Sequence, residues 1–269
     1  MSSAWRMPTY ASHATLLGLV LVAAACASNP NTDPADSQTQ AEAADTGSDL
    51  SQAELRAAAD RAPPLERANF WAGEHAKHPE DLETTLRFID ALRGIGSFER
   101  AAEVASQAAV LHPDSATLYL ALGRALAGQG RHETARKAFE QATRLDPENA
   151  NALAAKGLSL DRLGEHAAAQ ESYRHALNLQ PDRASTRSNL GLSLALTGDL
   201  EAAERELRQA VALPDANTRV RQNLALVLGL QGDFDGMNEV SADAPQAIVE
   251  QNVKLLKALR GKVDPASLQ

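Results

Sequence analysis

Residues 116–149 read ATLYLALGRALAGQGRHETARKAFEQATRLDPEN, and this stretch decides the fold. Apolar or small residues recur in it at three- and four-residue spacing in two runs, which predicts two amphipathic helices. Gly130 separates the runs, because glycine readily adopts the left-handed backbone conformation at which many helices end. Pro147 ends the second run, because proline cannot continue a helix. The stretch therefore predicts a pair of antiparallel helices.

The same residue pattern recurs along the chain every 34 residues, which predicts an all-α solenoid of helix pairs. Three series carry it: Pro79, Pro113, Pro147 and Pro181; Gly96, Gly130, Gly164, Gly198 and Gly232; and Ala101, Ala135, Ala169 and Ala203. A later proline, Pro214, comes one residue early. No strand-like alternation stands out. Within a pair, small residues such as Gly123 and Ala135 are expected to let the helices approach closely, with Phe139 filling the remaining space.

This pattern resembles the tetratricopeptide repeat (TPR). The resemblance implies a solenoid over residues 82–236, with repeats at 82–115, 116–149, 150–183 and 184–217 and an incomplete one at 218–244. Gly236 and Met237 predict that the last hairpin has a short or irregular second helix. Solenoids need atypical ends that shield their open faces.

Two such ends are predicted. A degenerate helical hairpin is expected at 51–81, turning at Pro63 and Pro64, with Phe70 and Trp71 facing the repeats. A closing helix is expected at 245–260. Its predicted apolar side consists of Ile248, Leu255, Leu256 and Leu259.

The N-terminus has the pattern of an export signal: Arg6, an apolar run over 16–25, and small residues before Cys26. It resembles the bacterial lipoprotein signal, which implies cleavage after residue 25 and acylation of Cys26, the chain's one cysteine. Ala23 stands where that family usually has leucine, so a plain secretory signal remains the alternative. Ala27, which is not aspartate, favours the outer membrane. Residues 26–50 carry five acids and no Lys or Arg, which predicts a disordered tether.

Composition excludes several classes of function. The formal charge of −9 disfavours binding to a phosphate backbone, and one cysteine forms neither an internal disulfide nor a thiolate metal site. His75 and His78 have the spacing of half a metal site, but no further ligands accompany them. We find no phosphate loop and no nucleophile motif. We therefore predict a protein that is no enzyme and has no cofactor or metal besides its lipid, the alternative being an enzyme that uses His75 and His78.

The TPR resemblance implies that the first helices of the pairs line a groove that binds a protein segment. In such a groove, Asn189 and Asn223 could bind a peptide backbone, and Leu158 and Leu192 would offer apolar contact. The predicted groove residues lack the lysines with which chaperone-type TPRs bind acidic C-terminal tails. They are Leu120, Arg124, Leu158, Asp161, Ser188, Asn189, Leu192, Arg219, Gln222 and Asn223.

A narrower resemblance rests on the stretch RVRQNLALVLGLQGDF at 219–234 and on the pair Asn252-Val253. Both are similar to the TadD lipoproteins of the tight-adherence (Flp, type IVc) pilus assembly system. The resemblance implies a pilotin-like factor that holds a segment of the secretin, or of another pilus component, and assists its assembly at the outer membrane. A general TPR lipoprotein that regulates peptidoglycan synthesis or outer-membrane protein assembly is the alternative.

Overall fold

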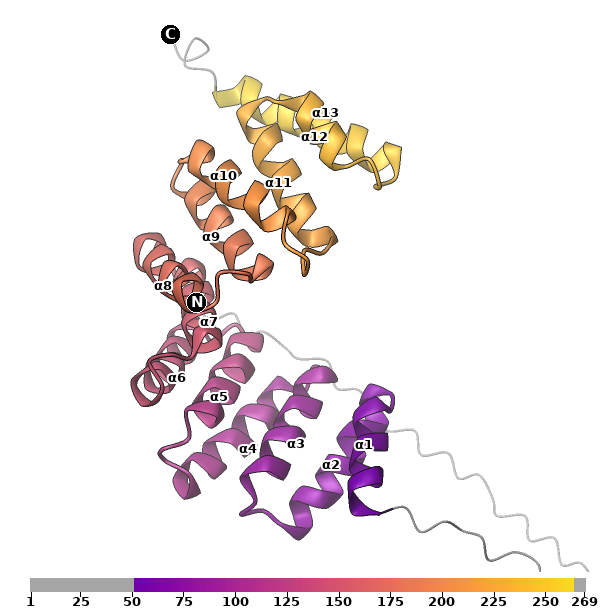
Figure 1. Cartoon of the computed structure of the whole chain (residues 1–269), viewed down its shortest axis with the longest axis vertical. Helices are drawn as coiled ribbons and strands as arrows, with labels where there is room; N and C mark the ends of the chain where they lie inside the picture. The colour runs from indigo at the N-terminus through magenta and orange to yellow at the C-terminus, as the bar shows by residue number, and fades with distance from the viewer. Residues whose placement is uncertain (1–50, 264–269) are drawn as a thin grey trace, which may run out of the picture. The chain divides into compact units, whose positions relative to one another are not determined.

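The computed structural model describes residues 51–263, with side chains through residue 257. The predicted signal peptide (1–25), the acylated Cys26 and the tether (26–50) lie outside the described residues, as does the side chain of Leu259. All regular structure in the described part is helical, which confirms the predicted all-α fold (Figure 1). The helices are α1 (Gln52–Arg61), α2 (Pro64–Lys77), α3 (Leu82–Gly94), α4 (Phe98–Leu111), α5 (Ala116–Gly128), α6 (His132–Leu145), α7 (Ala150–Arg162), α8 (His166–Leu179), α9 (Ala184–Leu196), α10 (Leu200–Val211), α11 (Thr218–Gln231), α12 (Phe234–Val240) and α13 (Gln246–Val263).

The five periodic glycines all have a left-handed backbone, with φ between 75° and 92°. Each follows an odd-numbered helix and starts the turn into the next helix. At Gly130, the Arg131 N–H donates to the Leu126 carbonyl at 3.0 Å and the Gly130 N–H to the Ala127 carbonyl at 3.0 Å. This pair of bonds is a Schellman motif, which satisfies carbonyls at the helix end. The glycine series therefore sets where the first helix of each pair stops.

The periodic prolines stand just after even-numbered helices. Helix α6, for example, ends at Leu145, two residues before Pro147. Proline disfavours helical backbone in the residue that precedes it, so the chain leaves the helix there. Helix α10 ends at Val211 and is two residues shorter than α8, consistent with the early Pro214.

The two helices of each middle pair meet at a glycine. A Cβ atom on Gly123 would lie 2.4 Å from Phe139 Cε1, one on Gly157 2.7 Å from Tyr173 Cε1, and one on Gly191 2.7 Å from Leu207 Cγ. The three large side chains are at most 1% exposed. Glycine on the odd helix thus makes room for a large residue on the even helix, as the sequence predicted for Gly123 and Phe139.

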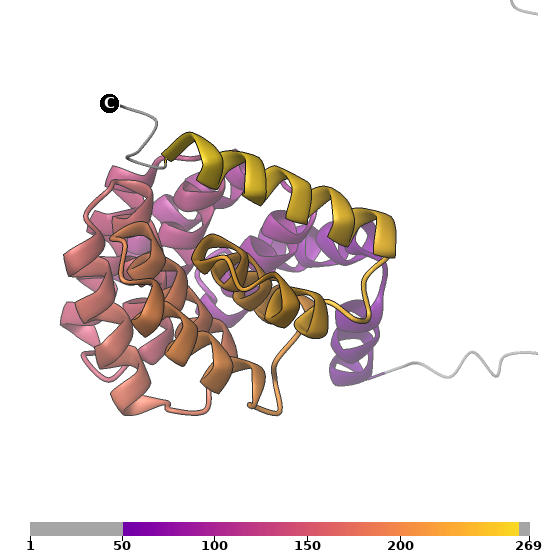
Figure 2. The same ribbon diagram turned by 90° about the horizontal axis from the view of Figure 1, so that it is seen from above.

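The helices form two layers. From α3 to α11, each odd helix packs against its own even helix and also against the next odd helix, as α3 does with α5 and α9 with α11. The buried apolar side chains lie between the layers. Seen in two directions, the pairs follow one another from α1 to α12, and α13 lies beside α12 at the C-terminal end (Figures 1 and 2). The odd helices therefore share one surface of the solenoid, which we call the inner surface.

At the N-terminal end, α1 and α2 pack against each other, and the chain passes between them at Pro63. Trp71 is 2% exposed, and its indole N–H donates to Asp60 at 3.2 Å. Phe70 meets Trp71 edge to face. Glu74, 3% exposed, accepts from Lys77, and this bond holds the pKa of the carboxyl group below its usual range. The hairpin thus packs its aromatic pair on the first repeat.

At the C-terminal end, α12 has only seven residues and α13 covers the space beyond it. The predicted apolar side of α13 is partly wrong. Leu256 is buried as expected, but Ile248 and Leu255 are 50% and 58% exposed, and Val249 is buried instead. The inward stripe is Val249, Val253 and Leu256, because Val253 and Leu256 pack against the core to which α11 and α12 contribute Leu228 and Met237.

Candidate partner-binding surface

The ten predicted groove residues all lie on odd helices, but they differ in exposure. Leu120 and Ser188 are buried. Leu158 is 44% exposed, and Arg219 and Gln222 are also exposed. The others are half-buried: Arg124, Asp161, Asn189, Leu192 and Asn223. Leu120 belongs to the core around Phe139, so its side chain is not free for a partner.

Three leucines stand at the same register of successive odd helices. Leu158 on α7, Leu192 on α9 and Leu226 on α11 are each 34 residues apart. Leu158 and Leu226 are 44% and 43% exposed, and Leu192 is half-buried. We call these three residues the leucine row. Leu226 was missed in the sequence, although adding one period to Leu192 would have found it.

An arginine continues this register towards the N-terminus. Arg124 on α5 stands 34 residues before Leu158. No described side chain forms a hydrogen bond or ion pair with it. Burial lowers the pKa of Arg124, and so do the positive charges of Arg93 and Arg183, which Asp90 only partly offsets. The repeat period could not identify Arg93 and Arg183, since they do not share the register of Arg124.

Arg93 and Arg183 already have partners of their own. Arg93 donates to Asp90 at 2.8 Å, and Arg183 donates to Asn151 at 2.9 Å. The guanidinium of Arg124 is therefore the unpaired one of the three. An unpaired, half-buried cation favours an incoming anion, because its charge has been partly desolvated without compensation.

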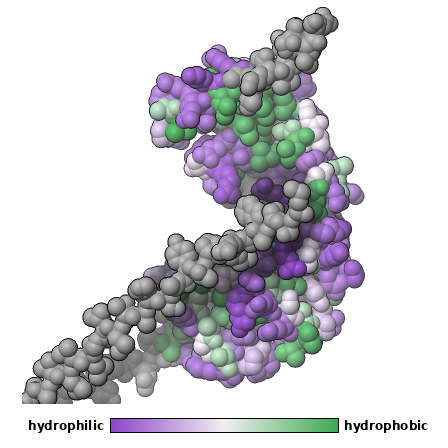
Figure 3. Space-filling model, turned by 180° about the vertical axis from the view of Figure 1, so that it is seen from behind, coloured by the Kyte–Doolittle hydropathy of each residue, from purple (hydrophilic) through white to green (hydrophobic). Residues whose placement is uncertain are grey.

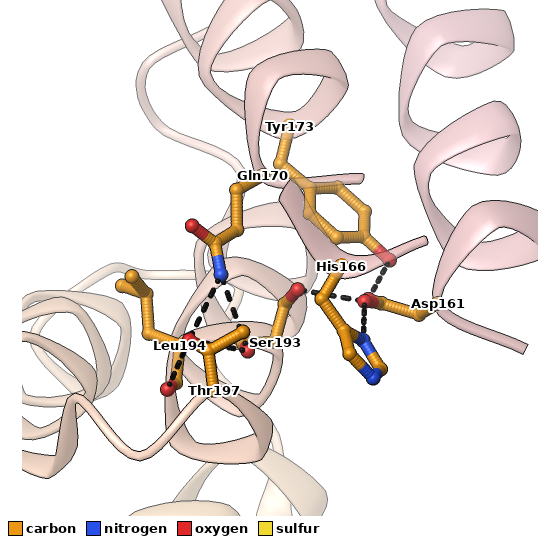
Figure 4. Close-up of polar contacts among 7 residues, drawn as sticks. All are labelled: Asp161, His166, Gln170, Tyr173, Ser193, Leu194 and Thr197. Atoms are coloured by element: carbon orange, nitrogen blue, oxygen red, sulfur yellow. Dashed lines mark hydrogen bonds and ion pairs between the residues drawn. The ribbon is translucent and has the colours of Figure 1, made fainter. Parts of the chain in front are cut away.

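Three of the predicted groove residues join neighbouring repeats. Asn223 Nδ2 donates to Ser188 Oγ at 2.9 Å, which ties α11 to α9. Asp161 accepts from Ser193 Oγ at 2.6 Å and from the Tyr173 hydroxyl at 3.0 Å (Figure 4). These contacts occupy polar atoms that a partner would otherwise use. The exposed Leu158, Arg219 and Gln222 and the half-buried Leu192 and Asn189 have no such bond.

Figure 4 shows a serine, a histidine and an aspartate close together, and their order of bonding argues against a catalytic triad. Ser193 and His166 both bond to Asp161 Oδ1, at 2.6 and 2.9 Å. A triad requires the serine to bond to the histidine, which takes its proton. Gln170 adds bonds to the Ser193 carbonyl and to Thr197. Tyr173 is fully buried, which together with the Asp161 charge raises the pKa of its hydroxyl. The cluster connects α7, α8 and α9.

His75 and His78 do not form a metal site with other described residues. Thr85 Oγ1 lies 3.0 Å from His75 Nδ1, and His78 Nδ1 lies 3.8 Å from a Glu80 carboxylate oxygen. Burial lowers the pKa of His75. Within residues 51–257, no group of three or more His, Cys, Asp or Glu side chains has the arrangement of a metal site.

A cleft of about 480 Å³ opens along α6, α7 and α8, away from the leucine row. Its lining includes Arg136, which pairs with Glu133 at 2.7 Å and Glu140 at 2.6 Å. These bonds raise the pKa of the guanidinium, so its charge is already compensated.

One face of the solenoid is hollowed (Figure 3). Hydrophilic residues lie deep in the hollow, and hydrophobic ones gather over the C-terminal helices above it. None of the helices in the described part is both long and apolar enough to cross a membrane.

Comparison with known families agrees with the repeat. The family model of the tetratricopeptide repeat matches residues 86–150 and 154–218. A search of curated proteins found no significant match.

Solved structures of TPR proteins are similar to the solenoid. A thermophilic TPR protein of Thermus thermophilus is 22% identical, with a TM-score of 0.55, over 61% of this chain and 90% of its own. YrrB, a TPR protein with an unusual peptide-binding site, is 20% identical, with a TM-score of 0.53, over 70% of this chain and 98% of its own. MamA from Desulfovibrio magneticus is 19% identical, with a TM-score of 0.51, over 68% and 96%. At these identities the likeness establishes the fold alone.

Proposed function

We propose that this chain, a TPR repeat protein whose solenoid is a scaffold for binding protein partners, is a lipid-anchored, pilotin-like factor of a tight-adherence pilus. In this proposal Cys26 carries the lipid, the outer membrane holds the anchor, and the inner surface binds a segment of the secretin. The protein does no chemistry of its own. Its task is to hold the subunit and to assist its assembly.

The observation that carries the binding role is the leucine row. Exposed leucines are common singly, but here three stand at one register of adjacent helices. Asn189, half-buried beside the row, keeps an amide without a described hydrogen-bond partner. Apolar side chains of a protein segment can pack on the leucines, and its backbone can hydrogen-bond with the Asn189 amide.

The pilus assignment rests on sequence. The stretch 219–234, similar to TadD lipoproteins, corresponds to α11 and the start of α12, and it contains Leu226 of the leucine row. A lipid at Cys26 would hold the solenoid at one membrane surface, which raises its effective concentration near a membrane-bound partner.

The test is affinity capture of the tagged full chain from detergent-solubilised bacterial envelopes, with the captured proteins identified by mass spectrometry. The expected result is enrichment of the secretin or another pilus component. A double variant, Leu158→Ser with Leu192→Ser, is expected to lose that enrichment while remaining folded by circular dichroism. Asn223 is left unchanged, since its replacement would also remove the bond to Ser188.

The matched control is Leu111→Ser, which alters a 60% exposed leucine on α4, an even helix. It should capture the same proteins as the wild type. Recovery of cell-wall synthases or barrel-assembly proteins in place of pilus components would contradict the pilus assignment. Equal capture by the wild type and the double variant would contradict the binding surface.

A further inference from the structure

Helix α1 is held to the rest of the solenoid mainly by polar contacts. Ala59 is its one buried residue, whereas α3 buries six. Gln52, Arg56 and Asp60 follow one another at four-residue spacing, so they share one face of α1. Leu55, the largest apolar side chain of the helix, is 39% exposed. Burial of apolar surface therefore contributes little to the docking of α1.

Glu74 on α2 binds the first half of this polar face. Its Oε2 accepts a hydrogen bond from Gln52 Nε2 at 2.8 Å and lies 3.6 Å from a guanidinium nitrogen of Arg56. The Nε atom of Arg56 is buried and has no hydrogen-bond partner. A buried donor without a partner has lost its water for nothing, so its cost offsets part of what the ion pair contributes.

Asp60 binds the second half, against Trp71 and α3. Its carboxylate accepts from the Trp71 indole N–H at 3.2 Å and from the guanidinium of Arg87. The guanidinium groups of Arg56 and Arg87 stand 5.9 and 5.7 Å from the centre of the Trp71 ring. The side chains of Arg87 and Asp60 are 47% and 36% exposed, and ion pairs this exposed contribute little and are screened by salt.

A helix docked in this way should open at a smaller free energy than its neighbours, because local opening costs least where few apolar contacts are buried. Ten residues alone form only a marginal helix in water, so α1 should unfold once it leaves α2. Ala62 and Pro63, which join the two helices, already have extended ψ angles of 158° and 150°. Release therefore breaks no helix at the hinge.

We propose that α1 is a latch, which docks reversibly over Trp71 and is released while the repeats remain folded. Release uncovers the indole ring and its N–H at the N-terminal end of the solenoid. It also frees residues 51–62, a segment that spans up to about 40 Å when extended. With a lipid on Cys26, the latch would set how far the repeats can move from the membrane.

Hydrogen exchange of the full chain purified in detergent, read by mass spectrometry, measures this release. In the wild type we expect the amides of α1 to exchange at least about tenfold faster than those of α3. Raising the salt concentration from about 0.05 M to about 1 M should speed exchange in α1 several-fold, because salt screens the ion pairs at Asp60 and Glu74. Exchange in α5 and α6 should not change.

A triple variant, Gln52→Ala with Arg56→Ala and Asp60→Ala, removes the docking contacts from the α1 side alone. Alanine favours a helix, so lost protection would report undocking and not a poorer helix. We expect α1 to exchange at least about tenfold faster than in the wild type, with α3 to α8 unchanged. Arg61→Ala is the matched control. It changes an exposed arginine of α1 that has no described partner, and it should leave exchange as in the wild type.

The fluorescence of Trp71 tests whether the latch covers this residue. Trp5 is the one other tryptophan of the chain, so the compared proteins all carry Trp5→Phe. The triple variant should shift the emission of Trp71 to the red, and acrylamide should quench it several-fold more strongly than in the wild type. Arg61→Ala should change neither.

Three outcomes would overturn the proposal. If α1 of the wild type exchanges as slowly as α3 at both salt concentrations, the helix is a fixed part of the solenoid. If the triple variant also speeds exchange in α3 to α8, the repeats depend on α1 and it is no latch. If α1 loses protection while the quenching of Trp71 is unchanged, α1 does not cover the indole.

Discussion

The middle repeats and the C-terminal end bury their odd helices in different ways. In the middle, a glycine on the odd helix faces a large side chain from the even helix of the same pair, as Gly123 faces Phe139. At the end, α12 stops at Val240, and Gly229 on α11 faces Leu256 of α13 together with Met237 of the short α12.

The difference shows how the solenoid accommodates a last repeat whose second helix is short. In the middle, each pair fills its own interior and then stacks on its neighbours. At the end, a helix from outside the repeat adds Leu256 to the apolar side chain that the short α12 provides. We therefore expect damage in the middle to spread through both neighbouring pairs and damage at the end to remain local.

The largest expected effect is in the middle, for Phe139→Ala. Phe139 is 1% exposed, and its removal leaves a cavity between α5 and α6, so we expect a loss of about 3–5 kcal/mol. Urea denaturation followed by far-UV circular dichroism measures it. Leu111→Ala, at an exposed position on α4, is the control and should change the midpoint little. If Phe139→Ala lowered the urea midpoint no more than Leu111→Ala does, the proposed role of Phe139 in filling the middle pairs would be contradicted.

Next in size is Leu256→Ala at the C-terminal end. Leu256 is 6% exposed and packs on Gly229, so we expect a loss of about 2–3 kcal/mol. Hydrogen exchange should speed up in α11 to α13 and remain unchanged in α3 to α8. Leu255→Ala, at the neighbouring exposed residue, is the matched control. Faster exchange throughout the solenoid would show that the two regions are coupled.

A smaller effect, and one that tests the glycine itself, is expected for Gly123→Ala. The new Cβ would overlap the Phe139 ring, and we expect a loss of about 1–3 kcal/mol from overpacking. Gly73→Ala in α2 is the opposite case, because no atom lies within 4 Å of its added Cβ. It should stabilise the protein by about 0.5–1 kcal/mol, through better helix propensity. Thermal unfolding compares the two variants. If both changes shifted the Tm in the same direction, close packing at Gly123 would be contradicted.

The smallest effect on stability is expected for Leu226→Ser in the leucine row. The side chain is 43% exposed, so its loss should change the unfolding free energy by at most about 0.5 kcal/mol. Capture of the partner protein from solubilised envelopes should nevertheless weaken several-fold. A large loss of stability with unchanged binding would mean that the row serves packing alone.

The repeat could be predicted because its signals are local. A glycine at the turn and a proline after the second helix act within a few residues, so their period marks the boundaries of α3 to α10 directly. The face of α13 could not be found in this way. Its apolar residues allow two overlapping stripes, and the one that is buried depends on the shape of α11 and α12.

The candidate surface shows the same limit. The period predicts which side chains share the odd helices, and it was sufficient to identify Leu158 and Leu192. It does not reveal that Ser193, 32 residues after Asp161, donates to that carboxylate, or that Asn223 bonds to Ser188. Nor does it reveal Arg93 and Arg183 beside Arg124. The binding role of the ten predicted residues stays a prediction.

The covering helix α13 also bears on how molecules meet one another. A solenoid is built from units that each dock on the one before, so an uncovered last pair would present to a second molecule the surface that a further repeat would use. Such head-to-tail contacts do not close, and they propagate into filaments. By placing Val253 and Leu256 against the core of α11 and α12, and Lys257 over the Phe234 ring, α13 occupies that surface. A chain cut before α13 should therefore polymerise end to end.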